Sequence, residues 1–355
     1  MSRYYCKFVL PKSENNLNPK EIKAVKALLK KPKNIVIVTH WSPDGDAIGS
    51  SLGLYNYLIK KEHSVTVITP NDYPKFLFWM KGNNKVLDFQ KKTKAAKTAA
   101  AAADIIFCLD FNSLKRIDKL GEEVSKSGAV KFIIDHHLQP EGFADYMLHD
   151  VGACSTCELV YDFIHLMGDG KLIDKDIANC LYTGIMTDTG SFRYPATTAK
   201  THRIISSLIA SGAENAEIHN RIYDDNTESR LRLLGYCLSE KLTVLPEYKT
   251  GYFSLTEAEM KRFNHQKGDT EGVVNYALSI NGIRFAAFFV ERDGVVKTSF
   301  RSKGSFDVNK FARAHFSGGG HANAAGGMSE VSLAKTLQKF TGLLPEYKKQ
   351  LHAKK

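Results

Sequence analysis

The chain has 355 residues, of which 43% are hydrophobic and 25% charged, and its formal net charge is +11 at pH 7. This length predicts two domains, and the absence of a long uncharged apolar stretch excludes a membrane span and a membrane partner. The excess of positive charge favours a polyanionic partner such as a nucleic acid or a nucleotide, although solvated helix faces explain it equally well.

In chain order, the N-terminal apolar stretch is too short for a secretory signal, so we expect a cytoplasmic protein. A helical pattern follows over residues 18–30. Strand patterns then alternate with helical ones, and these strands cover residues 35–39, 64–69, 104–109 and 130–134. The helices between them include residues 47–60 and an alanine-rich stretch at 95–103. This alternation predicts an α/β fold with a doubly wound, mainly parallel sheet.

The second half of the chain changes character. Residues 155–188 are helical in pattern, and two apolar runs flank Arg292-Asp293-Gly294, which is a strong hairpin signal. A smaller α+β domain with a mixed sheet is therefore expected at the C-terminus. The expected divisions are a catalytic domain over 1–198, a helical linker over 199–240, a substrate-binding domain over 241–345 and a basic tail over 346–355.

Acidic and histidine residues stand where the predicted strands and one helix end. They are His40, Asp44, Asp46, Asp110, Asp135, His136, His137 and Asp188. Because the carboxyl ends of parallel strands line the ligand crevice of an open α/β sheet, these side chains should converge. Each alone is more often a cap or turn residue, but together their charges would repel strongly without cations, which favours two divalent metal ions. Oxygen-rich sites containing an imidazole suit Mn²⁺, with Mg²⁺ or Co²⁺ as alternatives.

Two further segments carry possible chemistry. Cys154-Ser155-Thr156-Cys157 has zinc-type spacing, but no second such pair completes a site, which favours a reduced structural pair at a helix start. Gly318-Gly319-Gly320-His321 is either a flexible linker or a loop whose small residues let backbone amides approach a phosphate. Arg301 is a candidate for a bidentate grip on a phosphate.

The segment Thr39–Ser50 resembles the first motif of the DHH phosphoesterases. Asp110 is similar to the isolated aspartate of the second motif, Asp135-His136-His137 to the third motif and Thr187–Phe192 to the fourth. The glycine-rich segment resembles the GGGH motif of the DHH-associated C-terminal domain. The resemblance covers residues 30–330.

The resemblance implies a division of labour among these residues. His40, Asp44 and Asp110 would hold one metal ion. Asp46, His136 and Asp188 would hold the other, with Asp110 bridging. His137 would act beside the substrate phosphate, by stabilising charge or by protonating the leaving oxygen, and Asp135 would orient a neighbouring histidine. The substrate-binding residues would be Arg301, Gly318, Gly319, Gly320 and His321.

Within this family, a catalytic domain followed only by the DHH-associated domain is most similar to the nanoRNase-type oligoribonucleases. This resemblance implies hydrolysis of very short RNA to mononucleotides and of 3′-phosphoadenosine 5′-phosphate to AMP. Linear or cyclic dinucleotides and inorganic pyrophosphate or polyphosphate are alternative substrates. A non-catalytic nucleotide- or RNA-binding protein is the alternative from another class. The sequence leaves open whether a second copy of the chain is a partner in a homodimer.

Overall fold

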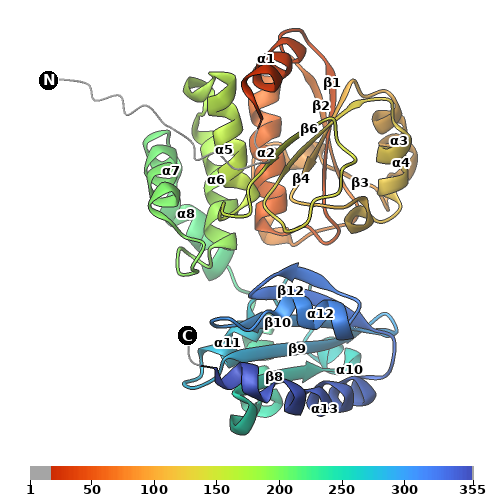
Figure 1. Ribbon diagram of the computed structural model, residues 1–355, viewed down its shortest axis with the longest axis vertical. Coiled ribbons are helices and arrows are strands. Elements are labelled where there is room, and N and C mark those ends of the chain that lie inside the picture. Colours follow the sequence, from red (N-terminus) through yellow and green to blue (C-terminus); the bar gives the residue numbers. More distant parts are fainter. Residues whose placement is uncertain (1–16, 354–355) are drawn as a thin grey trace, which may run out of the picture. The chain divides into compact units, whose positions relative to one another are not determined.

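The computed structural model describes residues 17–353, which fall into two compact units (Figure 1). The boundary between them along the chain lies between Asp224 and Asp225. This boundary lies inside the segment predicted as a helical linker. The N-terminal stretch that was examined for a secretory signal and the last two lysines of the predicted tail lie outside the described residues. None of the helices described within residues 17–353 is long and apolar enough to cross a bilayer.

The first unit contains a six-stranded parallel sheet with the strand order β3-β2-β1-β4-β5-β6. The strands are β1 (Asn34–Thr39), β2 (Ser64–Thr69), β3 (Leu87–Asp88), β4 (Ile105–Leu109), β5 (Val130–Asp135) and β6 (Tyr146–His149). The four predicted strands are all present, and the two strands that the sequence did not predict are the short ones at the edges of the sheet. The α/β class with a mainly parallel sheet is confirmed.

Helices cover both faces of this sheet, as Figure 1 shows. The helices of this unit are α1 (Pro19–Leu28), α2 (Gly45–Ile59), α3 (Thr93–Ala101), α4 (Leu120–Lys126), α5 (Thr156–Met167), α6 (Lys175–Asp188), α7 (Ala199–Ala210) and α8 (Asn215–His219). Of these, α7 and α8 pack against α6 (Figure 1). The side chains of successive residues of β1 lie on opposite faces of the sheet. Ile35 and Ile37 pack with α2, α5 and α6, whereas Val36 and Val38 pack with α3 and α4. Burial on both faces explains why the strands are continuous apolar runs.

Two helix boundaries differ from the predicted ones for local reasons. The predicted helix 47–60 begins earlier, at Gly45. The side chain of Asp44 caps this helix, because it accepts hydrogen bonds from the backbone N–H groups of Asp46 and Ala47. The predicted helical stretch 155–188 is interrupted after Met167, where Gly168 has a φ of 86°. Glycine adopts this left-handed conformation without a steric penalty, so it ends α5 and lets the chain turn back into α6.

The second unit contains a mixed six-stranded sheet with the order β11-β12-β10-β9-β8-β7. Its strands are β7 (Thr243–Leu245), β8 (Thr250–Leu255), β9 (Phe285–Arg292), β10 (Val295–Ser302), β11 (Gly319–His321) and β12 (Ala324–Ser329). Only β8 and β9 pair in parallel. The predicted hairpin is confirmed, because Arg292 of β9 lies opposite Val295 of β10 across the Asp293-Gly294 turn.

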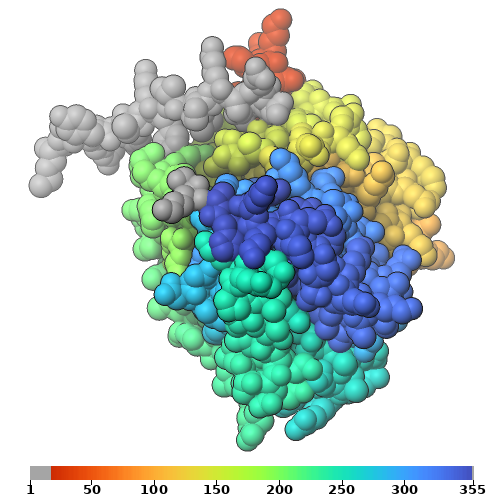
Figure 2. Space-filling model, turned by 60° about the horizontal axis from the view of Figure 1, so that its bottom comes forward, coloured from red at the N-terminus to blue at the C-terminus, as the bar shows by residue number. Residues whose placement is uncertain are grey.

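Helices also cover both faces of the second sheet. They are α9 (Glu228–Tyr236), α10 (Glu257–Arg262), α11 (Val273–Ser279), α12 (Val308–His315) and α13 (Leu333–His352). Phe285 and Phe289 pack with α12 and α13, and Phe288 packs with α11 on the other face. Helix α13, dark blue in Figure 2, is exposed on the surface of this unit and continues to His352, into the segment that the sequence predicts as a basic tail.

Three glycines allow α2 and α6 to pack closely in the first unit. A Cβ atom added at Gly49 of α2 would lie 2.6 Å from the carbonyl oxygen of Cys180 in α6. One added at Gly184 of α6 would lie 2.2 Å from Sγ of Cys157 and 2.8 Å from Oδ1 of Asp46. Gly45 is equally crowded, by the side chain of Thr187. The two helices can therefore approach this closely only where side chains are absent.

We predict that Gly184→Ala destabilises the first unit by about 1–3 kcal/mol, the usual cost of overpacking a core. Both tryptophans of the chain, Trp41 and Trp79, belong to this unit, so urea unfolding followed by tryptophan fluorescence reports on it selectively. Gly128→Ala is the control, because a Cβ atom there meets no heavy atom within 4 Å. Equal stability of the two variants would show that close packing is not what requires glycine at 184.

Candidate metal centre

The register of the sheet places three of the predicted site residues side by side. Thr39 of β1 lies opposite Leu109 of β4, which in turn lies opposite Ile134 of β5. The next residues along these strands are His40, Asp110 and Asp135, so they form one row at the carboxyl edge of the sheet. Neighbouring strands are about 4.8 Å apart, which brings the side chains of this row within reach of common ions.

The first cluster consists of His40, Asp44 and Asp110, whose potential ligand atoms all lie within 4.8 Å of one another. Nε2 of His40 lies 3.3 Å from Oδ2 of Asp110 and 3.8 Å from Oδ1 of Asp44. The other ring nitrogen of His40, Nδ1, is 2.9 Å from the backbone carbonyl oxygen of Trp41. Once neutral, a histidine that donates one N–H to a carbonyl presents a lone pair on its other nitrogen, which is the orientation that metal ligands adopt.

The second cluster consists of Asp46, His136 and Asp188, within the same 4.8 Å limit. Nε2 of His136 lies 3.8 Å from Oδ2 of Asp46 and 3.4 Å from Oδ2 of Asp188. It also lies 3.5 Å from Oδ1 of Asp110. Since the two oxygens of Asp110 face the two clusters, its carboxylate has the position of a ligand shared by both.

Burial of these groups makes their protonation states interdependent. Burial, together with repulsion from Asp110 and Asp188, raises the pKa of Asp46 well above its usual range. Burial by itself lowers the pKa of His40, but hydrogen bonds to Asp110 and Asp44 outweigh it and raise the pKa to about 10. His136 follows the same pattern, because Asp110 and Asp188 raise its pKa against the effect of burial.

Without a metal ion, the raised pKa values favour the protonated forms of these histidines and of Asp46. A divalent ion in each cluster would supply the positive charge that these carboxylates otherwise draw from protonated imidazoles. Each cluster offers two carboxylates and one imidazole, and this donor set suits hard or intermediate divalent cations. The residues fit two divalent metal ions.

His137 lies beside the two clusters and is oriented by Asp135. Its Nδ1 is 2.8 Å from Oδ1 of Asp135 and 3.6 Å from Oδ1 of Asp110. The backbone carbonyl of His137 is also fixed, since Nε2 of His149 in β6 lies 2.6 Å from it. Burial and the nearby charge of Arg116 lower the pKa of His137, so its neutral form is favoured near neutral pH.

The sequence patterns did not point to Arg116, His149 or Thr156. Arg116 lies in a short helical turn after β4, and its carbonyl oxygen accepts a hydrogen bond from the backbone N–H of Trp41. The hydroxyl of Thr156, at the start of α5, donates to Oδ1 of Asp110 over 3.0 Å. Cys154 and Cys157 are free, buried thiols at the same helix start, as predicted. The one available signal was the pair of cations, Lys115 and Arg116, that follows Asp110 closely in the sequence.

In the second unit, the predicted substrate-binding residues lie in β10 and in or directly before β11, two strands that both pair with β12. Arg301 of β10 and His321 of β11 both lie opposite Ala324 of β12, so they occupy one cross-strand row with a small residue between them. Gly320 has a φ of 150°, and its N–H donates to Oδ1 of Asn309 over 3.0 Å. Gly318 has no room for a side chain, because a Cβ atom would lie 2.0 Å from the carbonyl oxygen of Gly326. The segment is a paired strand, and the flexible-linker alternative is wrong.

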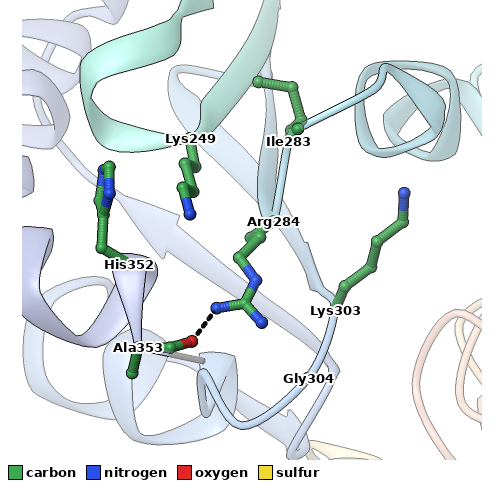
Figure 3. A pocket seen from close by; sticks show the side chains of 8 residues that line it. Lys249, Ile283, Arg284, Lys303, Gly304, His352 and Ala353 are labelled. Carbon is green, nitrogen blue, oxygen red and sulfur yellow. Dashed lines mark hydrogen bonds between the residues drawn. The ribbon is translucent and has the colours of Figure 1, made fainter. Parts of the chain in front are cut away.

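The same unit contains a basic pocket of about 470 Å³ (Figure 3). Lys249, Arg284, Lys303 and His352 contribute to its lining, which includes no acidic residue. The guanidinium of Arg284 donates to the backbone carbonyl of Ala353, and the side chain of Lys249 extends toward it. The pocket adds positive charge to the unit that carries Arg301 but contains none of the predicted site residues.

Comparison with known proteins agrees with this geometry. Residues 34–185 match the N-terminal domain of the DHH family, and residues 252–350 match the DHHA1 domain. The chain belongs to the DHH family of phosphoesterases and is a metal-dependent hydrolase.

Several relatives resemble the chain over most of its length. The bifunctional oligoribonuclease and PAP phosphatase NrnA of Thermus thermophilus is 32% identical over 292 residues, which span 82% of this chain and 83% of the relative. The protein of the same name from Bacillus subtilis is 29% identical over 295 residues, spanning 82% of this chain and 88% of the relative. The crystal structure of an exopolyphosphatase-related protein from Bacteroides fragilis has 42% identity and a TM-score of 0.89, covering 94% of this chain and 97% of that one.

We predict that binding of Mn²⁺ releases protons and that its affinity falls as the pH falls. In the metal-free protein the raised pKa values keep His40 and His136 protonated at neutral pH, whereas metal ligation requires neutral imidazoles. The affinity should therefore increase about tenfold per pH unit for each proton released, up to about pH 10, where His40 loses its proton unaided. Calorimetric titrations between about pH 6 and 8 test this, and an affinity independent of pH would contradict it.

Proposed function

We propose that the protein hydrolyses very short oligoribonucleotides to mononucleotides and 3′-phosphoadenosine 5′-phosphate to AMP, using two divalent metal ions, with Mn²⁺ favoured. The observation that carries the proposal is the pair of carboxylate–imidazole clusters that share Asp110. It occurs in a chain about 30% identical to enzymes named for these two activities. The proposal keeps the cytoplasmic location predicted from the sequence.

In this proposal each cluster of the first unit holds one ion. His40, Asp44 and Asp110 would bind the first, and Asp46, His136 and Asp188 the second. When bound, two such ions polarise a phosphate and activate water as the nucleophile. The chain's own contribution is to keep their ligands fixed and buried before substrate arrives, so that little reorganisation is needed during the reaction.

His137 would donate a proton to the leaving oxygen. Asp135 holds Nδ1, which directs Nε2 of the ring to the reaction. A bound phosphate brings negative charge beside His137 and offsets the positive charge of Arg116, which contributes to lowering its pKa in the free protein. His137 would therefore take up a proton as substrate binds and donate it to the departing oxygen.

The second unit would hold a phosphate of the substrate. Arg301 presents a guanidinium suited to two phosphate oxygens, and His321 shares its cross-strand row. Residues 318–320 are all glycines, and the absence of side chains would let a ligand approach the main chain closely. These residues would determine affinity more than the rate of the chemical step.

Inorganic polyphosphate is the second candidate substrate. The structurally similar protein from Bacteroides fragilis is described as exopolyphosphatase-related, and a two-metal site acts on phosphoanhydrides as well as on phosphodiesters. The choice between the candidates depends on whether the chain recognises nucleosides.

The experiment that tests the proposal compares substrates in the presence of Mn²⁺. We expect mononucleotides to be released fastest from RNA of about two to five nucleotides, with slower cleavage of RNA of about twenty, because an extended polymer needs a longer binding track. Phosphate should also be released from 3′-phosphoadenosine 5′-phosphate. Asp110→Asn, the control, should be inactive on every substrate. Turnover of polyphosphate alone would refute the oligoribonuclease proposal.

We further predict that Arg301→Ala raises KM for short RNA about 10- to 100-fold, the loss expected for hydrogen bonds to a charged group, while kcat changes little. Arg292→Ala is a matched control in the same hairpin, because its side chain is paired with the adjacent Asp293. Mn²⁺ affinity should be unaltered in both variants. Loss of metal from Arg301→Ala would refute the assignment of Arg301 to substrate binding.

A further inference from the structure

The first turn of α5 contacts two of the carboxylates in the candidate metal centre. The backbone N–H of Thr156 donates to Oδ2 of Asp46 over 2.6 Å, and that of Cys157 donates to Oδ1 of Asp46 over 2.9 Å. The hydroxyl of Thr156 donates to Oδ1 of Asp110 over 3.0 Å. One residue of α5 therefore connects a carboxylate of the second cluster with the carboxylate that both clusters share.

The backbone N–H groups of Thr156 and Cys157 are available to Asp46 because of how α5 begins. Ser155 caps α5, and its hydroxyl oxygen accepts a hydrogen bond from the N–H of Glu158 over 3.1 Å. The N–H groups of Thr156 and Cys157 lie earlier in the first turn and have no partner within the helix. They meet the carboxylate of Asp46, and a negative charge is favoured at this end of a helix.

The direction of the Thr156 hydroxyl distinguishes it from the threonines near the end of α6. Thr183, Thr187 and Thr189 each donate to a carbonyl oxygen one turn earlier in their own helix. Thr156 instead donates to a residue 46 positions earlier in the chain. Thr156 and its partners Asp46 and Asp110 are all buried, so these bonds are shielded from bulk solvent.

Neighbouring contacts hold this helix start in place. The buried carboxylate of Glu158, in the same turn, lies 2.9 Å from Nζ of Lys200 in α7 and accepts a hydrogen bond from the Thr201 hydroxyl over 3.1 Å. Cys154 donates its S–H to the same carboxylate over 3.0 Å. The first turn of α5 is therefore attached to α7 on one side and to the two carboxylates on the other.

We propose that Thr156 is a positioning residue that fixes Asp110 as the ligand shared by the two metal ions and, through its backbone N–H, fixes Asp46 as a ligand of the second. Its hydroxyl contacts Oδ1, the Asp110 oxygen that faces His136, and leaves Oδ2 to the first cluster. Removal of the hydroxyl therefore acts mainly on the second ion. This inference rests on the two-metal site of the proposed function but not on its substrate.

The test is a titration of the metal-free protein with Mn²⁺, followed by calorimetry and electron paramagnetic resonance without substrate. We expect Thr156→Val to bind the second Mn²⁺ about 10- to 100-fold more weakly, the usual consequence of losing a hydrogen bond to a metal ligand. The spin-coupled signal of a paired site should weaken in favour of isolated Mn²⁺. Thr156→Ser, which keeps the hydroxyl, should bind both ions as the unaltered protein does.

Thr183→Val is the matched control, because it removes a buried threonine hydroxyl that donates to a carbonyl oxygen of its own helix. Tryptophan fluorescence checks that each variant is folded, and Thr156→Ala replaces the valine variant if that one unfolds. Equal binding of both ions by folded Thr156→Val and by the unaltered protein would overturn the proposal, as would equal weakening in Thr183→Val. A protein that binds the paired ions but does not cleave RNA would refute only the proposed function.

Discussion

Repulsion among buried carboxylates is the constraint on which the rest of the first unit depends. Asp46, Asp110 and Asp135 are all almost inaccessible to solvent, and the first two face each other across His136. Such groups are unstable together unless positive charge or hydrogen-bond donors surround them. In the metal-free protein the imidazoles of His40 and His136 provide that charge by keeping their protons. Divalent cations could supply the same positive charge, and to do so they must displace these protons.

Close helix packing determines which carboxylates can meet. Asp46 belongs to the first turn of α2 and Asp188 to the last turn of α6, and both face His136 because these antiparallel neighbours pack through glycines. The amino end of α5 then reaches Asp46 and Asp110 together. The candidate metal centre is therefore held by three helices as well as by the strand ends. A change in helix packing away from the ligands should consequently alter metal binding.

The second unit contributes a different kind of chemistry. Its predicted substrate-binding residues are Arg301, His321 and the three glycines 318–320. Arg301 and His321 lie in one cross-strand row of the sheet. The nearby basic pocket has no acidic lining residue either. A unit with these properties suits an anionic ligand, whereas the first unit suits cations. Hydrolysis of a phosphate ester by the proposed mechanism would use both kinds of chemistry in one chain.

The sequence by itself determined the class of the first sheet and the residues of its carboxyl edge. Strands buried on both faces must be continuous apolar runs, so the polar residues that end them, His40, Asp110 and Asp135, could be recognised from local pattern alone. Only the tertiary structure decided what supports them. Thr156 lies at the start of a helix and His149 in an edge strand, and the local sequence indicates no more than that. Their roles depend on partners in other elements of the fold. Hydrogen bonds of this kind leave no periodicity in the sequence, because they are set by how α5 and β6 pack and not by the local backbone.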